Sequence, residues 1–177
     1  MCEQVLEKET LSSLVPHRGG MLLLSKVNGY NLEERSLCAE YHVGEDCLFY
    51  DPVIRGVPAW VGFEFMAQAI SVLSGLRGRL RGEKPKIGFI MSISSMRMGL
   101  PLFRAGSAVE VKVRESGSMD MVYTFEGEIL LEGKKVMEGK LTVMDAKDEL
   151  IDTLKTNTLK TNTLKTDTVE KGNDTSV

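Results

Sequence analysis

Cysteines and histidines are scarce in this sequence, and their spacing excludes several kinds of site. The three cysteines, Cys2, Cys38 and Cys47, form no CxxC pair, so we expect reduced thiols in a cytoplasmic protein. The only two histidines are His17 and His42. No clustered set of metal ligands and no glycine-rich phosphate loop is present. We therefore predict neither a metal nor an organic cofactor.

The sequence also lacks long apolar runs and an excess of charge of one sign. No apolar run reaches the roughly 20 residues that cross a bilayer, and the first residues lack the basic-then-apolar order of a signal peptide. The net charge is −3 with acidic and basic residues interspersed, which leaves no basic footprint for nucleic acid. We expect a soluble protein without a membrane span or a nucleic-acid partner.

The chain divides into a domain, residues 1–147, and a low-complexity tail, residues 148–177. In the tail a Leu-Lys-Thr-Asn-Thr unit starts at Leu154 and recurs unchanged at Leu159. A third copy starts at Leu164 and has aspartate in place of asparagine. A five-residue period matches neither a helix face nor the alternation of a strand. We predict that the tail is disordered, and we assign it no chemistry.

Within the domain, five stretches rich in β-forming or alternating residues predict strands. They are Ser36–Val43, Ile87–Met98, Ala108–Arg114, Met121–Leu131 and Lys135–Val143. Turn residues at 115–118 and 132–134 predict hairpins. The pattern favours an antiparallel meander with one face exposed to solvent and the other covered.

One apolar segment, from Pro58 onward, predicts the helix that covers this sheet. Pro58 suits a first helical turn, and Gly75 and Gly78 are stop signals after Leu73. The segment is apolar nearly all round, which is typical of a buried helix. Composition and periodicity therefore predict an α+β domain with a helix packed on an antiparallel sheet.

Glu64 is the main candidate functional residue, because it lies inside this apolar segment. An unpaired buried charge is costly, so such a carboxylate finds a partner, becomes protonated or serves in catalysis. Gln68 lies one helical turn further along the same face. It either orients Glu64 or binds backbone in a neighbouring strand.

Two motifs resemble the bacterial 3-hydroxyacyl-(acyl-carrier-protein) dehydratases. Residues 14–24, LVPHRGGMLLL, resemble the "LPHR-x-P-hydrophobic" segment of that family, and residues 56–69, GVPAWVGFEFMAQA, resemble its "PG-(x)4-E-x-MAQ" central helix. The resemblance spans residues 11–145, and its wording is nearest to the branch associated with aryl-polyene pigments.

The resemblance implies a hotdog fold, a long buried helix wrapped by an antiparallel sheet. It also implies dehydration of a 3-hydroxyacyl thioester on acyl carrier protein, in a tunnel beside the helix and across a dimer interface. A histidine would take the Cα proton while Glu64 serves the departing hydroxyl. Backbone N–H groups of Ala59 and Trp60 at the helix start would stabilise the thioester oxygen. An apolar setting favours the protonated carboxylic acid, which suits a proton donor.

One departure from the family pattern concerns the base. The family's loop histidine falls at Tyr50, in a loop that has no histidine. His17 is the replacement candidate within the chain, because imidazole exchanges protons near neutral pH. Alternatively, His17 has a structural role or lies at the tunnel mouth. A third hypothesis is that the base comes from a partner, so the protein is a homodimer or a heterodimer with another hotdog subunit. Tyr50 and Asp51 are further candidates for acid–base chemistry, and they are equally plausible as turn residues.

The leading function is a dehydratase-like lyase. The alternatives are an acyl thioesterase of the same fold, and a non-catalytic acyl-binding or partner subunit. A basic stretch after the helix is either a solvated loop or a docking patch for the acidic carrier protein; it comprises Arg77, Arg79, Arg81, Lys84 and Lys86. His42, in a predicted strand, is expected to be a surface or half-buried side chain.

Overall fold

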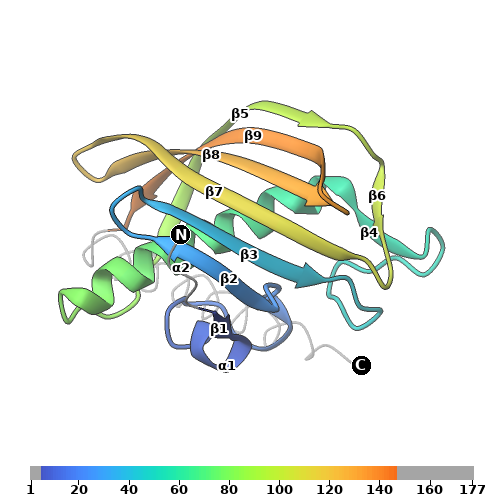
Figure 1. The fold of residues 1–177 in the computed structure, drawn as a ribbon, viewed down its shortest axis with the longest axis horizontal. Helices are drawn as coiled ribbons and strands as arrows, with labels where there is room; N and C mark the ends of the chain where they lie inside the picture. Colours follow the sequence, from blue (N-terminus) through green and yellow to red (C-terminus); the bar gives the residue numbers. More distant parts are fainter. Residues whose placement is uncertain (1–4, 147–177) are drawn as a thin grey trace, which may run out of the picture. The chain divides into compact units, whose positions relative to one another are not determined.

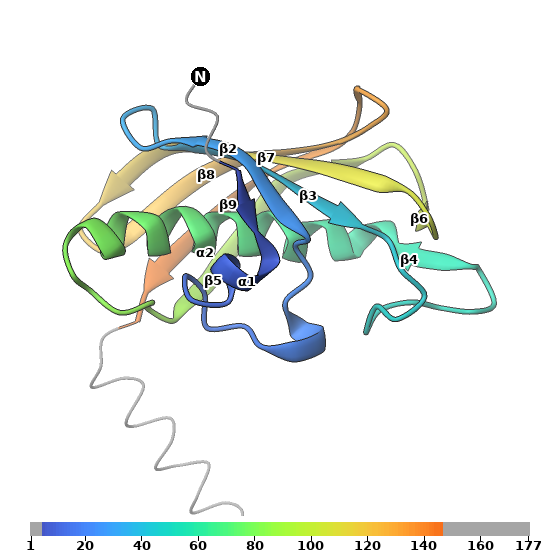
Figure 2. The same ribbon diagram turned by 60° about the horizontal axis from the view of Figure 1, so that its bottom comes forward.

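The computed structural model describes residues 5–146, which form one large antiparallel sheet with a long helix beneath it (Figures 1 and 2). The strands are β1 (Leu6–Glu7), β2 (Lys26–Asn31), β3 (Ser36–His42), β4 (Gly56–Pro58), β5 (Gly88–Met98), β6 (Leu102–Arg104), β7 (Ala108–Met119), β8 (Val122–Leu131) and β9 (Lys134–Asp145). The helices are α1 (Lys8–Leu11), η1 (Gly19–Met21), η2 (Ala59–Val61) and α2 (Gly62–Leu80). The predicted tail, residues 148–177, lies outside the described residues.

The strand order in the main sheet is β1-β2-β3-β7-β8-β9-β5, and β4 pairs with β6 in a separate ribbon. Strands β7, β8 and β9 form the predicted meander. The prediction was wrong for β5, which pairs with β9 and not with β7. Strand β5 precedes the meander in sequence, but in the sheet it lies beside β9, the last strand of the meander. It therefore forms an outer edge of the sheet.

Alternating residues on the inner face of the sheet build the core. In the pairing of β3 with β7, Leu37 is opposite Val113 and Ala39 is opposite Val111, and all four side chains are buried. Such cross-strand apolar pairs stabilise the sheet and fix its register, because a slip by one residue would expose them. The alternation seen in the sequence of β7 is confirmed.

Helix α2 lies against this inner face and contacts β3, β7, β8 and β9 (Figure 2). Phe65, Met66, Ala69 and Leu73 are fully or almost fully buried in the helix–sheet interface. Gly127 on β8 permits the close approach, since a Cβ at this position would lie 2.6 Å from the Met66 sulfur. The arrangement is the predicted hotdog fold.

The predicted ends of the helix were wrong. Pro58 closes β4 instead of opening the helix, and the short helix η2 stands between it and α2. At the other end α2 continues through Gly75 and Gly78 to Leu80. Gly75 is required for packing, because a Cβ there would lie 2.1 Å from the Leu14 carbonyl oxygen. The glycine is a contact point with the N-terminal segment and does not end the helix.

One predicted hairpin is confirmed and the other lies elsewhere. Glu132 and Gly133, with φ of 50° and 75°, form the two-residue turn between β8 and β9. The predicted turn at residues 115–118 is instead a β-bulge within β7, where the register shifts between Glu115 and Gly117. The chain turns later, at Asp120, which has a φ of 53°.

By length and composition the segment Ala59–Leu80 resembles a membrane-spanning helix, with a mean hydropathy of 1.3 over its most apolar window. However, 61% of that window is buried inside the protein. This burial is typical of the core helix of a soluble domain, which explains why the segment is apolar on almost every side.

Candidate active site

Glu64 lies in the first turn of α2, with its carboxylate at the edge of the core. Its side chain retains 19% of its accessible surface, and it lines a cavity of about 700 Å³ that runs beside the helix. The carboxylate is therefore partly withdrawn from water yet open to a ligand. A cavity of this size is typical of small-molecule sites.

Gln68 connects this carboxylate to the N-terminal segment. Its fully buried amide nitrogen donates to Glu64 Oε1 at 2.9 Å and to the Met21 carbonyl at 2.7 Å. Its amide oxygen accepts from the Leu23 backbone N–H at 2.9 Å. Gln68 therefore contacts Glu64 and also binds backbone, but the backbone belongs to the N-terminal segment before β2 and not, as the second alternative expected, to a neighbouring strand.

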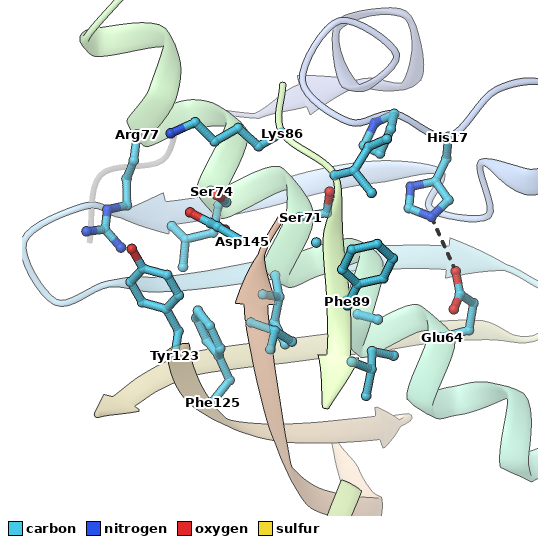
Figure 3. Close-up of a pocket in the computed structure, with 18 of the residues that line it drawn as sticks. His17, Glu64, Ser71, Ser74, Arg77, Lys86, Phe89, Tyr123, Phe125 and Asp145 are labelled. Carbon is cyan, nitrogen blue, oxygen red and sulfur yellow. Dashed lines mark ion pairs between the residues drawn. The ribbon is translucent and has the colours of Figure 1, made fainter. Parts of the chain in front are cut away.

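His17 faces Glu64 across the cavity mouth (Figure 3). Its Nε2 lies 3.6 Å from Glu64 Oε1, and its side chain is 26% exposed. This separation is longer than a hydrogen bond. It brings together the two residues that the sequence singled out for acid–base chemistry, although they are 47 positions apart.

The other ring nitrogen of His17 has an unusual environment. His17 Nδ1 is buried and has no hydrogen-bond partner among the described residues. Buried polar atoms are normally paired, and a histidine that acts as a base is usually oriented through its second nitrogen. The loop around it is held by Arg18, which donates to the carbonyls of Val15 and His17 at 2.5 and 2.8 Å. The residues described here thus position the ring without bonding Nδ1.

The cavity continues along α2 away from this pair (Figure 3). Its middle is apolar, and its far end is polar. The apolar wall is formed by Ala67, Ile70, Leu73, Phe89, Ile90, Phe125 and Val143. The far end is formed by Ser74, Arg77, Arg81, Lys86, Tyr123 and Asp145.

The structure does not leave both predicted oxyanion donors, the backbone N–H groups of Ala59 and Trp60, available at the cavity. The Ala59 backbone N–H donates to the Pro101 carbonyl at 2.9 Å, so this amide is already used within the chain. Trp60 is 51% exposed, is not among the residues that line the cavity, and its ring contacts Phe49 and Phe63.

The remaining sequence candidates lie away from the cavity. Asp51 exchanges backbone hydrogen bonds with Gly56, and its carboxylate accepts from the Val53 N–H at 2.8 Å, which is the geometry of a turn. Tyr50 does not line the cavity. His42 is 62% exposed beside Glu40, which is the surface position of the two predicted alternatives.

The basic stretch after the helix divides between two environments. Arg77, Arg81 and Lys86 line the cavity, whereas Arg79 donates to the Ser13 hydroxyl at 2.6 Å. The sequence marked these cations as a group. It carried no signal for Tyr123 and Asp145, which reach the same cavity from the sheet.

Comparison with known proteins agrees with the fold and identifies the family. Residues 9–155 match the ApeP-like family, described as ApeP dehydratase, and the chain belongs to this family. It is 28% identical over 155 residues to the 3-hydroxyacyl-(acyl-carrier-protein) dehydratase FabZ of Chlamydia trachomatis, covering 83% of this chain and 97% of the relative. It is 22% identical over 142 residues to the FabZ of Rhodopseudomonas palustris, covering 76% and 89%. The predicted family is confirmed.

Solved structures support the same assignment. The dehydratase heterocomplex ApeI:P from Xenorhabdus doucetiae matches with a TM-score of 0.73 and 26% identity, covering 81% of this chain and 95% of that one. The TT0310 protein from Thermus thermophilus matches with a TM-score of 0.53 and 18% identity, covering 80% and 100%, and shows the fold alone. The chain is therefore a hotdog protein of the dehydratase family.

Proposed function

We propose that this protein dehydrates a 3-hydroxyacyl thioester carried on acyl carrier protein to the trans-2-enoyl thioester. The observation that carries the proposal is the pairing of His17 and Glu64, 3.6 Å apart at the mouth of a cavity with an apolar middle. An acid and a base that face one substrate are what this elimination requires. The apolar wall suits an acyl chain.

In the proposed reaction, His17 Nε2 removes the proton from Cα of the substrate. The C3–O bond breaks as the Cα=C3 double bond forms, and Glu64 supplies the proton with which the hydroxyl leaves as water. The proton taken by His17 then returns to Glu64 through a bridging water, because their separation of 3.6 Å is longer than a direct hydrogen bond. No proton is gained or lost over the cycle.

Gln68 and the helix start have supporting roles in this proposal. Gln68 positions Glu64, because its amide is fixed by two backbone hydrogen bonds. The family resemblance also implies that the Trp60 backbone N–H donates to the thioester oxygen, but Trp60 does not line the cavity, so this proposed role rests on the resemblance alone. Ala59 is left out of this role, since its N–H is bonded to Pro101.

We further propose that the working form is a dimer, either with a second copy or with another hotdog subunit. The edge strand β5 pairs only with β9 among the described strands. It exposes apolar side chains with few charges between them, and such an edge is a template for pairing with another chain; they are Ile90, Met91, Ile93 and Met98. The match to the ApeI:P heterocomplex supports this form.

The absence of a histidine at Tyr50 and the unpaired His17 Nδ1 favour a second candidate. In this alternative the partner subunit completes the site, and the chain alone binds acyl thioesters without turning them over.

Incubation of the purified chain with 3-hydroxyacyl-(acyl carrier protein), followed by mass spectrometry of the carrier, tests the proposal. The enoyl thioester is the expected product. Release of free acid would identify a thioesterase instead, and unchanged bound ligand would identify an acyl-binding subunit. Repeating the assay with a co-expressed hotdog partner then separates the last outcome from inactivity of the site.

A further inference from the structure

The far end of the cavity has polar groups that the proposed dehydration does not use. Ser74 and Arg77 come from α2, Tyr123 from β8 and Asp145 from β9. Figure 3 shows these side chains at the end opposite His17 and Glu64. The helical rise from Glu64 to Arg77 is about 20 Å. A ligand that fills the cavity therefore meets polar groups at both of its ends.

The cations at this end already have carboxylate partners. Arg77 Nη1 lies 2.8 Å from Oε2 of Glu115, whose side chain is only 1% exposed and also contacts Arg35. Arg81 and Lys86 both pair with Glu83, at 2.7 and 3.0 Å. The partners hold these cations in place, and each carboxylate is shared between two cations, so their positive charge is offset in part. The end is consequently polar without being strongly cationic.

Two groups in the same place have no such partner. Among the described residues, neither the Tyr123 hydroxyl nor the Asp145 carboxylate has a hydrogen bond or an ion pair. Burial raises the pKa of Asp145, and the nearby Lys86, Arg77 and Arg81 act against that rise. A half-buried acceptor and a hydroxyl are therefore available to a ligand.

The chemistry of this end selects among terminal groups. A terminal carboxylate would lie beside Asp145 and a terminal ammonium beside Arg77 and Lys86, so a charged end of either sign meets a like charge as well as an opposite one. A methyl group would leave the Tyr123 hydroxyl and the Asp145 carboxylate desolvated without partners. A neutral hydroxyl can donate to Asp145 and accept from Tyr123, so it satisfies both groups at once.

We propose that the far end of the cavity binds a hydroxyl group at the end of the acyl chain, with Tyr123 and Asp145 as specificity determinants. This inference rests on the proposed function, because it assumes that the thioester end of the chain lies at His17 and Glu64. Arg77, held by Glu115, positions the wall of this subsite.

The test uses pairs of 3-hydroxyacyl pantetheine thioesters of equal chain length, one ending in a methyl group and the other in a hydroxyl. Over a series of lengths, the hydroxyl is expected to raise kcat/KM at least about fivefold once the chain spans the cavity. Equal kcat/KM at every length, or a preference for a terminal carboxylate, would overturn the inference.

Two variants test whether Tyr123 and Asp145 cause the preference for the hydroxyl-ended substrate. Tyr123→Phe and Asp145→Asn should each lower the preference for the hydroxyl several-fold. Asp120→Asn is the matched control, because Asp120 is exposed in the β7–β8 turn and its positive φ suits asparagine. A preference that survives both test variants unchanged would overturn the assignment of these residues.

Calorimetric titration with saturated acyl pantetheine thioesters, which cannot be dehydrated, separates this inference from the proposed function. Tighter binding of the hydroxyl-ended ligand without turnover of any substrate would support the subsite and refute the dehydratase. Dehydration of both substrates with equal binding of both ligands would support the dehydratase and refute the subsite.

Discussion

The Gln68 side-chain amide, 2.9 Å from Glu64 Oε1, joins the candidate acid to the N-terminal segment. The same amide bonds the backbone of Met21 and Leu23. Its nitrogen and its oxygen are thus both used to fix one carboxylate against the N-terminal segment. Gln68 is consequently important for stability and for the position of the acid.

Replacing Gln68 with methionine keeps the side-chain volume but removes these hydrogen bonds. The Leu23 N–H and the Met21 carbonyl would lose a partner, which should lower the free energy of unfolding by roughly 2–5 kcal/mol. Urea denaturation measures this loss. An unfolding free energy equal to that of the wild type would show that water or another group replaces the amide.

The two histidines provide a matched pair of variants. His17→Ala should lower dehydratase turnover by at least about 100-fold, the typical contribution of a general base. His42→Ala should leave turnover unchanged, because His42 is exposed on β3 and does not line the cavity. Steady-state kinetics of both purified variants decides. Equal turnover in the two variants would assign the base to another residue or to a partner.

The sequence predicted the core of the fold because periodicity reports burial. The alternation of Val109, Val111 and Val113 indicated β7, and the continuous apolar segment indicated the buried helix. Packing between distant segments left no local signal. The stop assigned to Gly75 was wrong because the glycine accommodates the backbone of Leu14, 61 positions earlier.

Gly75 and Gly78 therefore respond oppositely to alanine. Gly75→Ala should destabilise the protein, since the new Cβ would lie 2.1 Å from the Leu14 carbonyl oxygen. Gly78→Ala should stabilise it by about 0.5–1 kcal/mol, because the nearest atom to its Cβ is 3.7 Å away and alanine favours helix. Thermal unfolding of the two variants tests the pair. A stabilised Gly75→Ala variant would contradict the contact.

Cys38 should be unreactive in the folded protein. Burial, together with the nearby Glu110 and Glu40 carboxylates, raises the pKa of its thiol to about 11. At pH 8 its thiolate fraction is then at least about 100-fold below that of an ordinary thiol. Timed alkylation at pH 8 with peptide mapping should show Cys38 labelled slowly in the folded chain and rapidly in urea. Fast labelling without urea would contradict the raised pKa.

The site was predictable only where the sequence placed chemistry in an unexpected environment. Glu64 was found because a charge interrupts an apolar helix, and His17 because the chain has just two histidines. Tyr123 and Asp145 are ordinary residues of alternating strands. Only the pairing of β8 with β9 beside α2 brings them to the cavity, so local patterns could not identify them.

The most direct test compares dehydration of 3-hydroxyacyl-(acyl carrier protein) by the wild type and by Glu64→Gln, in the same oligomeric form. Glutamine keeps the size of the side chain but cannot donate a carboxylic acid proton, so turnover should fall by at least about 100-fold while the melting temperature stays unchanged. Turnover by the folded Glu64→Gln variant at the wild-type rate would contradict the proposal that this carboxyl group protonates the departing hydroxyl.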